Sequence, residues 1–310
     1  MKLAALLLAA ALMPQAPIER RPPPPQQVPT IKVETRLVNV AVNVVDEHGA
    51  PVPGLTQDDF QISEDSHPQK IAFFEKESST PLSIVLAIDA SGSVLADERL
   101  EKDAAKHFVN ALLRDQDELD LMDFSDTVRE IVPFTNQKKQ IEHGLSQLQR
   151  GDETVLYDAI YLGAQRLAST RQDAGRRRVL VLITDGVDTK GTRYEQALEQ
   201  TQRAGAMIYP LIIVPVEADA GRNTGGEHAL IQMAHDTGGK YYYVEDPKAL
   251  ESAFAHVSDD LRTQYVLGYY APQGLRHDQS LRTITVQLKD PALRGKYSLR
   301  YRTGYYSEAR

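Results

Sequence analysis

The hydrophobic residues follow two different patterns, one near both ends of the chain and the other in its middle. Between residues 38 and 44, valine takes every second position, and smaller or polar residues take the others. Such a period of two is typical of a β-strand with one buried face. The same alternation predicts five more strands, over residues 59–63, 70–75, 264–270, 282–288 and 296–301.

These strands form two groups, and neither group is large enough to make a pair of packed sheets by itself. Together they supply about six strands, which is enough for a small β-sandwich. We therefore expect residues 31–80 and 264–306 to pack against each other as the two parts of one β-sandwich, with residues 81–263 inserted between them. Two separate small β units are the alternative.

The middle of the chain alternates continuous apolar runs with amphipathic stretches. A continuous apolar run is expected of a strand that is buried on both faces, and apolar residues at every third or fourth position are expected of a helix. The runs lie at 83–88, 118–124, 179–184, 206–214 and 240–244, with an antiparallel edge strand at 127–134, and the helical stretches lie at 100–112, 141–148, 159–167 and 250–261. This order predicts an α/β fold with a doubly wound, mostly parallel sheet.

The first residues have the layout of a secretory signal peptide. Residues 1–16 carry one lysine, an apolar run and then small residues, and the run is shorter than the roughly 20 apolar residues of a membrane-spanning helix. Residues 17–30 contain four consecutive prolines, which favour an extended spacer. We expect an exported protein, located in the periplasm, in the cell envelope or outside the cell, with no transmembrane helix in its body. Because proline follows Ala16 directly, an uncleaved N-terminal anchor is the alternative.

Composition narrows the functional classes. The chain of 310 residues has 43 acidic and 35 basic side chains, and the resulting formal charge of −8 disfavours a nucleic-acid-binding surface. The absence of cysteine excludes disulfides, thiolate metal sites and a cysteine nucleophile. Three arginines at 176–178 precede a predicted strand, where we expect a solvated strand start, with a patch for an acidic partner as the alternative.

Oxygen-bearing side chains follow the predicted strands, at the edge where parallel sheets bind ligands. Asp89, Ser91 and Ser93 come after one apolar run, Asp185 comes after another, and Thr154 precedes a predicted helix. Carboxylates and hydroxyls are hard oxygen ligands that suit Mg²⁺, with Mn²⁺ or Ca²⁺ as alternatives. The two carboxylates balance the charge of a divalent ion. The hydroxyls add ligands without adding charge, so the ion remains able to accept one more carboxylate from outside.

The spacing Asp89-x-Ser91-x-Ser93, the threonine before LYDAI (Thr154) and the aspartate of ITDG (Asp185) resemble the metal-ion-dependent adhesion site (MIDAS) of von Willebrand factor type A domains. The flanking phrases GAPVPGLTQDDFQISED and RYRTGYY resemble exported bacterial proteins with a related domain. The resemblance implies a doubly wound, Rossmann-like sheet and these five residues as ligands of the ion, directly or through water. It also implies a partner protein whose Asp or Glu carboxylate takes the vacant position on the ion.

The chain departs from this family pattern next to the threonine. Many relatives have two glycines there, whereas this chain has Asp152 and Glu153. The additional negative charge weakens the binding of an acidic ligand, or Glu153 itself occupies the open position on the ion. Taken singly, Ser91 or Ser93 also fits a helix-capping role, which needs one residue and not five.

The motifs of two enzyme classes are absent or altered. Phosphatases with an aspartyl nucleophile have Asp-x-Asp, whereas Ser91 takes the second position here, and a hydroxyl is no proton donor near neutral pH. The Gly-x-Ser-x-Gly elbow of serine hydrolases does not occur in the sequence. His107 and His235 lie in helical contexts, where surface or capping roles are expected.

We therefore expect a non-catalytic, exported, metal-dependent protein-binding module with a role in adhesion or interaction. Two alternatives remain open. One is a metal-dependent hydrolase or phosphotransfer enzyme that uses the same ion, and the other is an architectural component of the cell envelope.

Overall fold

The computed structural model describes residues 37–76, 80–91, 98–170, 176–214, 224–271 and 279–307. The predicted signal peptide, the proline-rich linker and Ser93 lie outside these residues. Thr35–Arg310 belongs to one compact unit. Within the ranges that the structure describes, no helix combines the length and the hydropathy needed to span a membrane.

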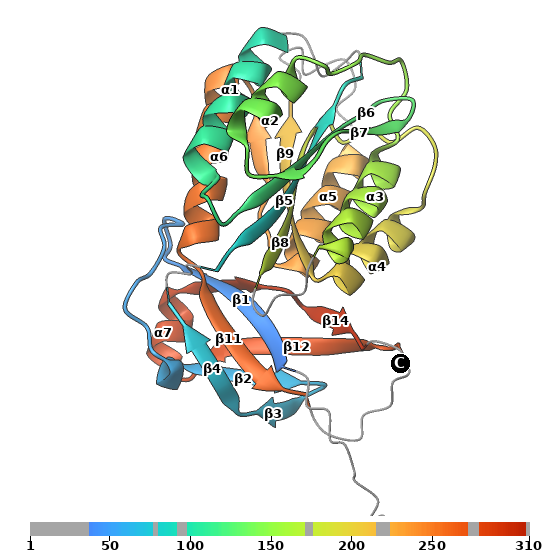
Figure 1. Cartoon of the computed structure of the whole chain (residues 1–310). Helices are drawn as coiled ribbons and strands as arrows, with labels where there is room; N and C mark the ends of the chain where they lie inside the picture. The colour runs from blue at the N-terminus through green and yellow to red at the C-terminus, as the bar shows by residue number, and fades with distance from the viewer. Residues whose placement is uncertain are drawn as a thin grey trace, which may run out of the picture. The chain divides into compact units, whose positions relative to one another are not determined.

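The middle of the chain forms a six-stranded sheet with the order β10-β9-β8-β5-β6-β7 (Figure 1). Neighbouring strands pair in parallel, except that β7 runs antiparallel to β6 at the edge. The strands are β5 (Leu82–Asp89), β6 (Glu118–Phe124), β7 (Val128–Thr135), β8 (Arg177–Thr184), β9 (Ala206–Ile213) and β10 (Tyr242–Val244). Every residue of β5 is buried, as its continuous apolar run predicts.

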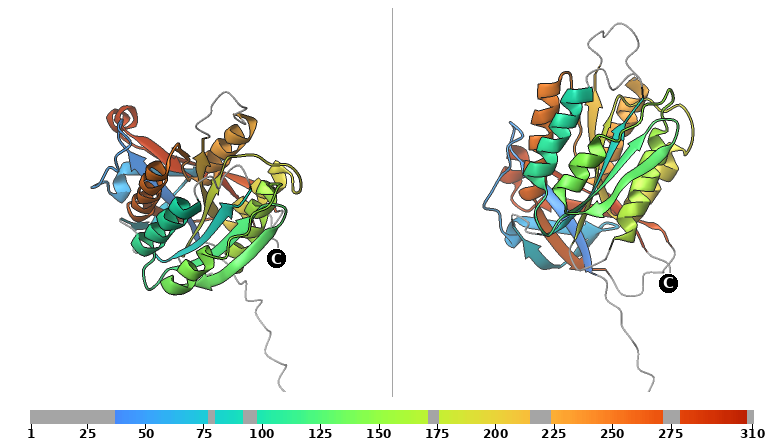
Figure 2. Two further views of the ribbon diagram at one scale, coloured as in Figure 1. Left: turned by 90° about the horizontal axis from the view of Figure 1, so that it is seen from above. Right: turned by 45° about the horizontal axis from the view of Figure 1, so that its top comes forward.

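Helices cover both faces of this sheet (Figures 1 and 2). One face carries α1, α2 and α6, the other carries α3, α4 and α5, and each face has its own buried hydrophobic cluster. The helices are α1 (Glu98–Leu112), α2 (Lys138–Leu145), α3 (Leu156–Ser169), α4 (Tyr194–Ala204), α5 (Thr224–Thr237) and α6 (Pro247–Arg262). The predicted doubly wound, mostly parallel α/β fold is confirmed. The hydrophobic pattern did not predict α4 and α5. Helix α4 buries only small side chains, and α5 buries the polar residues Glu227 and Thr237 besides Leu230, Met233 and Ala234.

Strands from the two ends of the chain form two further four-stranded sheets, with the orders β13-β1-β11-β4 and β14-β12-β2-β3. Their elements are β1 (Leu37–Val45), η1 (Gln57–Asp59), β2 (Phe60–Glu64), β3 (His67–Gln69), β4 (Ile71–Glu75), β11 (Tyr265–Tyr270), β12 (Leu281–Leu288), α7 (Pro291–Lys296), β13 (Ser298–Tyr301) and β14 (Gly304–Tyr306). Because β1 pairs with β11 and β13, and β2 pairs with β12, each sheet combines both ends of the chain. The terminal segments thus form the small β-sandwich of the predicted fold class, while the domain limits at 31–80, 81–263 and 264–306 stay predictions.

Polar contacts join the sandwich to the α/β domain. Arg177, the first residue of β8, is 8% exposed and donates to the side chain of Gln264 and, at 2.6 Å, to the carbonyl of Leu261. Arg300 of β13 donates to both carboxylate oxygens of Asp260 in α6, at 3.0 and 2.9 Å. The expected solvated strand start is therefore wrong for Arg177, because the chain enters the sandwich directly beside the start of β8.

The end of α5 also lies against the sandwich. The amide of Thr303 donates to the carbonyl of Asp236 at 3.0 Å. Gly238 follows α5 with a φ of +80°, and a Cβ atom on it would lie 2.5 Å from the backbone nitrogen of Arg302. Two backbones meet here at a distance that leaves room for glycine alone.

A buried carboxyl group lies beside the edge strand β7. Asp120 of β6 is fully buried, and Arg166 of α3 donates to it at 3.3 Å and also to Glu130 of β7. Burial and, to a smaller extent, the neighbouring Glu130 carboxylate raise the pKa of Asp120 to about 8 against the opposing effect of Arg166. The Asp120 carboxyl therefore keeps its proton near neutral pH.

We predict that Gly238→Ala destabilises the protein more than Gly205→Ala does. Both residues have a positive φ, +80° and +63°, so alanine costs about 1–2 kcal/mol in backbone strain at either position. The new methyl group at Gly238 also meets a backbone, whereas at Gly205 the nearest atom is the end of the Arg302 side chain, at 3.3 Å. Urea unfolding measures the difference, and equal losses would contradict the close docking of α5 on the sandwich.

We predict that Asp120→Asn removes part of the pH dependence of stability. Because the pKa of Asp120 is raised from 3.8 to about 8, its protonated form stabilises the fold fully below about pH 4, and this contribution is lost as the pH rises through 8. Between pH 5 and pH 8.5, the free energy of unfolding of the variant should rise by at least about 1 kcal/mol relative to that of the wild type. Urea unfolding at both pH values, with Asp103→Asn at a half-exposed side chain as control, tests this. A constant difference between variant and wild type would contradict it.

Candidate metal centre

The end of β5 and the loop before α3 are held together at the carboxyl end of the central sheet. A parallel bridge joins Ser91 to Gly151, and the amide of Gly151 donates to the carbonyl of Ala90 at 3.2 Å. The loop that carries Thr154 therefore begins beside the residues that follow Asp89. This brings the first and second predicted ligand segments to the same place.

The carboxylate of Asp89 connects β5 to β8. Its Oδ2 atom accepts a hydrogen bond from the hydroxyl of Thr184 at 2.7 Å, and its Oδ1 atom accepts one from the amide of Ser91 at 3.0 Å. The Ser91 hydroxyl hydrogen-bonds to the same carboxylate. Because Asp185 directly follows Thr184, these bonds bring the two acidic loops together.

The carboxylate of Asp89 lies in an electrostatically unfavourable setting. Asp89 is fully buried, and this burial raises its pKa to about 6; hydrogen bonds from Ser91 and Thr184 oppose the rise, and the nearby negative charge of Asp185 adds to it. A buried carboxylate beside another carboxylate needs a positive charge to be ionised at low cost. A divalent cation would supply that charge.

The backbone of Thr154 is held on both sides by one residue, Thr189, in the loop after β8. The Thr154 amide donates to the hydroxyl of Thr189 at 3.1 Å, and the Thr154 carbonyl accepts from the hydroxyl and the amide of Thr189, at 3.0 and 2.9 Å. Thr154 is 4% exposed. Its own hydroxyl has no hydrogen-bond partner among the residues that the structure describes. The backbone is thus fixed while the hydroxyl remains available as a ligand.

Four of the five predicted ligands lie in the described part of the chain. Direct contacts or charge interactions link Asp89, Ser91 and Asp185, and backbone contacts bring the Thr154 loop to both of their loops. Ser93 lies outside the described residues. The structure therefore gathers the segments of these four residues at one sheet edge.

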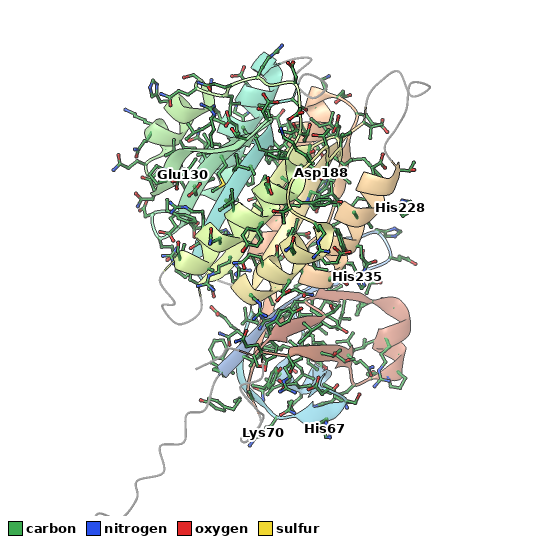
Figure 3. The ribbon with its side chains drawn as sticks, turned by 90° about the vertical axis from the view of Figure 1, so that its right-hand side faces the viewer. His67, Lys70, Glu130, Asp188, His228 and His235 are labelled. Atoms are coloured by element: carbon green, nitrogen blue, oxygen red, sulfur yellow. The ribbon has the colours of Figure 1, made fainter. Side chains whose placement is uncertain are left out.

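Thr184, Asp188 and Thr189 also belong to this site, although the sequence patterns did not indicate them. Asp188 accepts a hydrogen bond from the amide of Tyr157 at 3.2 Å, at the start of α3 (Figure 3). Burial raises the pKa of Asp188, and the bonds from the backbone of α3 oppose this rise. The available signal was the run of hydroxyl and carboxyl residues on both sides of Asp185 in the sequence TDGVDT.

Glu153 is one of the two acidic residues that stand before Thr154, where many von Willebrand factor type A domains have glycine. Its carboxylate forms an ion pair with the ammonium group of Lys190, and both side chains are about half exposed. The charge of Glu153 is thus partly balanced within the protein. The ion pair also connects the Thr154 loop to the loop that follows Asp185.

The donor set fits a hard divalent ion. Within the described ranges there is no group of three or more His, Cys, Asp or Glu side chains that could hold a metal. Two carboxylates together with hydroxyls remain, and this set suits Mg²⁺ or Mn²⁺ better than the softer, nitrogen- or sulfur-seeking metals. The available hydroxyl of Thr154 and the destabilised carboxylate of Asp89 both fit such an ion.

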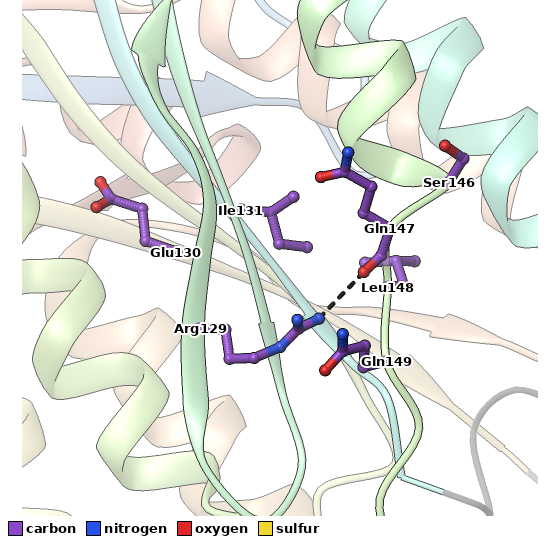
Figure 4. Close-up of a pocket in the computed structure, with 7 residues that line it drawn as sticks. All are labelled: Arg129, Glu130, Ile131, Ser146, Gln147, Leu148 and Gln149. Atoms are coloured by element: carbon purple, nitrogen blue, oxygen red, sulfur yellow. Dashed lines mark hydrogen bonds between the residues drawn. The ribbon is translucent and has the colours of Figure 1, made fainter.

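Other polar features lie on the surface of the α/β domain. His228 and His235 are exposed on α5 (Figure 3) and bind the carbonyl of Thr224 and the carboxylate of Asp236. A polar pocket lies between β7 and residues 146–149 (Figure 4). Its arginine, Arg129, already donates to Asp123 and to the carbonyl of Gln147, so its charge is satisfied within the protein.

Comparison with known proteins identifies the middle of the chain. A family model of the von Willebrand factor type A domain matches residues 83–256. The structure is similar to that of a von Willebrand factor type A protein from Catenulispora acidiphila, with 11% identity and a TM-score of 0.51 over 90% of this chain and 74% of that chain. At this identity the similarity shows the fold. No curated protein matches the chain.

Two further solved structures have lower TM-scores. An aerotolerance-related membrane protein from Bacteroides fragilis NCTC 9343 is 21% identical, with a TM-score of 0.44 over 57% of this chain and 98% of that chain. Proximal thread matrix protein 1 from the mussel byssus, solved with a zinc-occupied MIDAS motif, is 16% identical, with a TM-score of 0.49 over 60% of this chain and 49% of that chain.

We predict that Asp89→Asn stabilises the protein in the presence of a chelator at neutral pH. The substitution removes a buried charge and keeps an oxygen that accepts the hydrogen bond from Ser91, while its amide group replaces the oxygen that accepts from Thr184 and donates to the Thr184 hydroxyl oxygen instead. The free energy of unfolding should therefore rise by about 1 kcal/mol. Asp185→Asn is the matched control, because the Asp185 side chain is only partly buried whereas Asp89 is fully buried. Urea unfolding measures both, and a marked loss of stability in Asp89→Asn would contradict the electrostatic argument.

Proposed function

Because the chain belongs to the von Willebrand factor type A domain family, we propose that it is an exported, metal-dependent protein-binding module. Domains of this family commonly serve metal-dependent adhesion or interaction. The ligands of the ion are Asp89, Ser91, Ser93, Thr154 and Asp185. The ion is Mg²⁺, with Mn²⁺ or Ca²⁺ as alternatives, and a carboxylate from an Asp or Glu side chain of a partner protein completes its coordination.

One observation carries the proposal. The fully buried carboxylate of Asp89 binds the side chain of Thr184, the residue before Asp185, at the same end of the sheet as the available hydroxyl of Thr154. A dication would balance the buried charge and give the hydroxyl a partner. Because the side chains supply only two negative charges, the ion retains attraction for a third carboxylate from outside.

The surroundings of the site also support binding rather than catalysis. The exposed histidines on α5 bind local carbonyl and carboxylate groups, and the buried Asp89 is hydrogen-bonded through both of its oxygens. When bound, the ion supplies a Lewis-acidic point for a carboxylate, and the residues of this chain orient it and exclude water from its inner side. Export rests on the signal-like residues 1–16 and the spacer at 17–30.

Metal binding is the first test. Calorimetric titration of the chelator-treated protein with Mg²⁺ and with Mn²⁺ should show one site per chain, and Asp89→Ala should weaken it more than about 100-fold, because losing a residue that only supports a ligand already costs about 10–100-fold. Asp103→Ala, at a half-exposed position of α1, is the matched control. Equal metal affinities of the wild type and Asp89→Ala would contradict the proposed metal site.

Carboxylate recognition is the second test. On a synthetic peptide array, every peptide with Asp or Glu is paired with its Asn or Gln counterpart, and binding of the labelled protein is measured with Mn²⁺ or with chelator. The proposal requires signals that depend on both the metal and the carboxylate. Binding that persists in chelator or with the amide peptides contradicts it.

A further inference from the structure

We propose that Thr189 and Asp188 are positioning residues of the metal centre: they fix the Thr154 ligand relative to Asp185 and thereby set the affinity and size preference for the ion. This inference rests on the proposed function. It assigns a role to the loop between β8 and α4, residues 185–193, beyond the ligand Asp185 that it carries.

Thr189 acts on the backbone of Thr154. Its hydroxyl accepts from the Thr154 amide at 3.1 Å and donates to the Thr154 carbonyl at 3.0 Å, and its own amide donates to the same carbonyl at 2.9 Å. Three hydrogen bonds therefore come from one residue, four positions after Asp185. None of them uses the Thr154 hydroxyl, so the clamp orients this ligand without competing for it.

Asp188 acts on the helix that follows Thr154. Its carboxylate accepts from the amide of Tyr157 at 3.2 Å and from that of Leu156, in the first turn of α3. The first amides of a helix have no partner within it, and a negative charge at a helix N-terminus is favourable. Asp188 thus fixes the direction in which α3 leaves the Thr154 loop.

Further contacts make the connection between the two loops continuous. Lys190 pairs with Glu153, and Asp158 of α3 accepts from the amide of Thr192 at 2.8 Å. Gly191, with a φ of +109°, lies so close to Asp158 that a Cβ atom would be 2.5 Å from its carboxylate. The residues just after Asp185 therefore hold the segment from 153 to 158 at several points.

The opposite side of the Thr154 loop is held separately, by the turn between β6 and β7. Asp126 accepts from the amides of Asp152 and Glu153 at 3.2 and 2.8 Å, and the carbonyl of Ser125 accepts from the amide of Val155 at 3.0 Å. Removing the Thr189 hydroxyl therefore leaves the loop folded and still joined to the loop after Asp185 through the Thr189 amide, but without the two hydroxyl hydrogen bonds that fix the backbone of Thr154. The distance between two ligands becomes adjustable, while the ligands themselves remain.

An adjustable distance affects small ions more than large ones. Mg²⁺ needs octahedral geometry with ligands at about 2.0–2.1 Å, whereas Ca²⁺ accepts flexible geometry at about 2.3–2.6 Å. Loss of the clamp should therefore weaken Mg²⁺ binding more than Ca²⁺ binding. A change in this ratio distinguishes a positioning role from a general loss of stability, which would weaken both ions alike.

The experiment compares three variants with the wild type by calorimetric titration with Mg²⁺ and with Ca²⁺. Thr189→Val removes the hydroxyl, Thr189→Ser restores it, and Thr170→Val is the matched control. The Thr170 hydroxyl likewise donates to a carbonyl, that of Leu167 at 2.7 Å, and accepts from an N–H group, that of Arg178 at 3.3 Å, but at the far end of α3. Melting temperatures in chelator verify that each variant folds.

We expect Thr189→Val to weaken Mg²⁺ binding by about 10–100-fold and to lower the Mg²⁺/Ca²⁺ affinity ratio, with near wild-type behaviour of Thr189→Ser and Thr170→Val. Should Thr189→Val not fold, Asp188→Ala is tested instead, and we expect it too to weaken Mg²⁺ binding and to lower the Mg²⁺/Ca²⁺ affinity ratio. Unchanged Mg²⁺ binding, or equal losses for the two ions, overturns the positioning role while leaving the proposed function intact. A wild-type protein that binds neither ion overturns the proposed function, and the positioning role with it.

Discussion

The burial of one carboxylate, that of Asp89, is the constraint on which the site depends. It stands at the end of β5, a strand whose every residue is buried between two helical layers, so its charge has little access to water. Donors from Ser91 and Thr184 satisfy its oxygens but do not offset the cost of ionisation, as its raised pKa shows. A cation beside this carboxylate would lower the cost of its ionisation, and the surrounding loops bring further side-chain oxygens to the same end of the sheet.

The loops at the carboxyl ends of the central strands are held together by a series of contacts. Asp89 binds the residue before Asp185, the loop after Asp185 holds the backbone of Thr154, and the turn after β6 holds the other side of the same loop. Backbone groups carry most of these contacts, which leaves side-chain oxygens such as the Thr154 hydroxyl for a ligand. Hydrogen bonds, together with the Glu153–Lys190 ion pair, thus hold the described part of this polar site, which has no histidine or cysteine cluster among its residues.

The β-sandwich contacts the opposite end of the α/β domain. Its contacts involve the first residue of β8 and the ends of α5 and α6, whereas the candidate ligands follow the last residues of β5 and β8. The strands thus separate the two regions (Figure 1). The candidate ligands therefore lie at the end of the α/β domain that does not contact the sandwich.

The sequence by itself determined the elements whose signal is local. Alternating valines predicted β1, continuous apolar runs predicted the central sheet, and strand-end oxygen residues indicated the candidate ligands, because periodicity and spacing are properties of neighbouring residues. Tertiary structure alone decided the burial of Arg177, the raised pKa of Asp120 and the clamp by Thr189. Each of these features depends on a contact between segments that are distant along the chain. Such contacts arise from the packing of loops and helices, which the local periodicity of the sequence does not indicate.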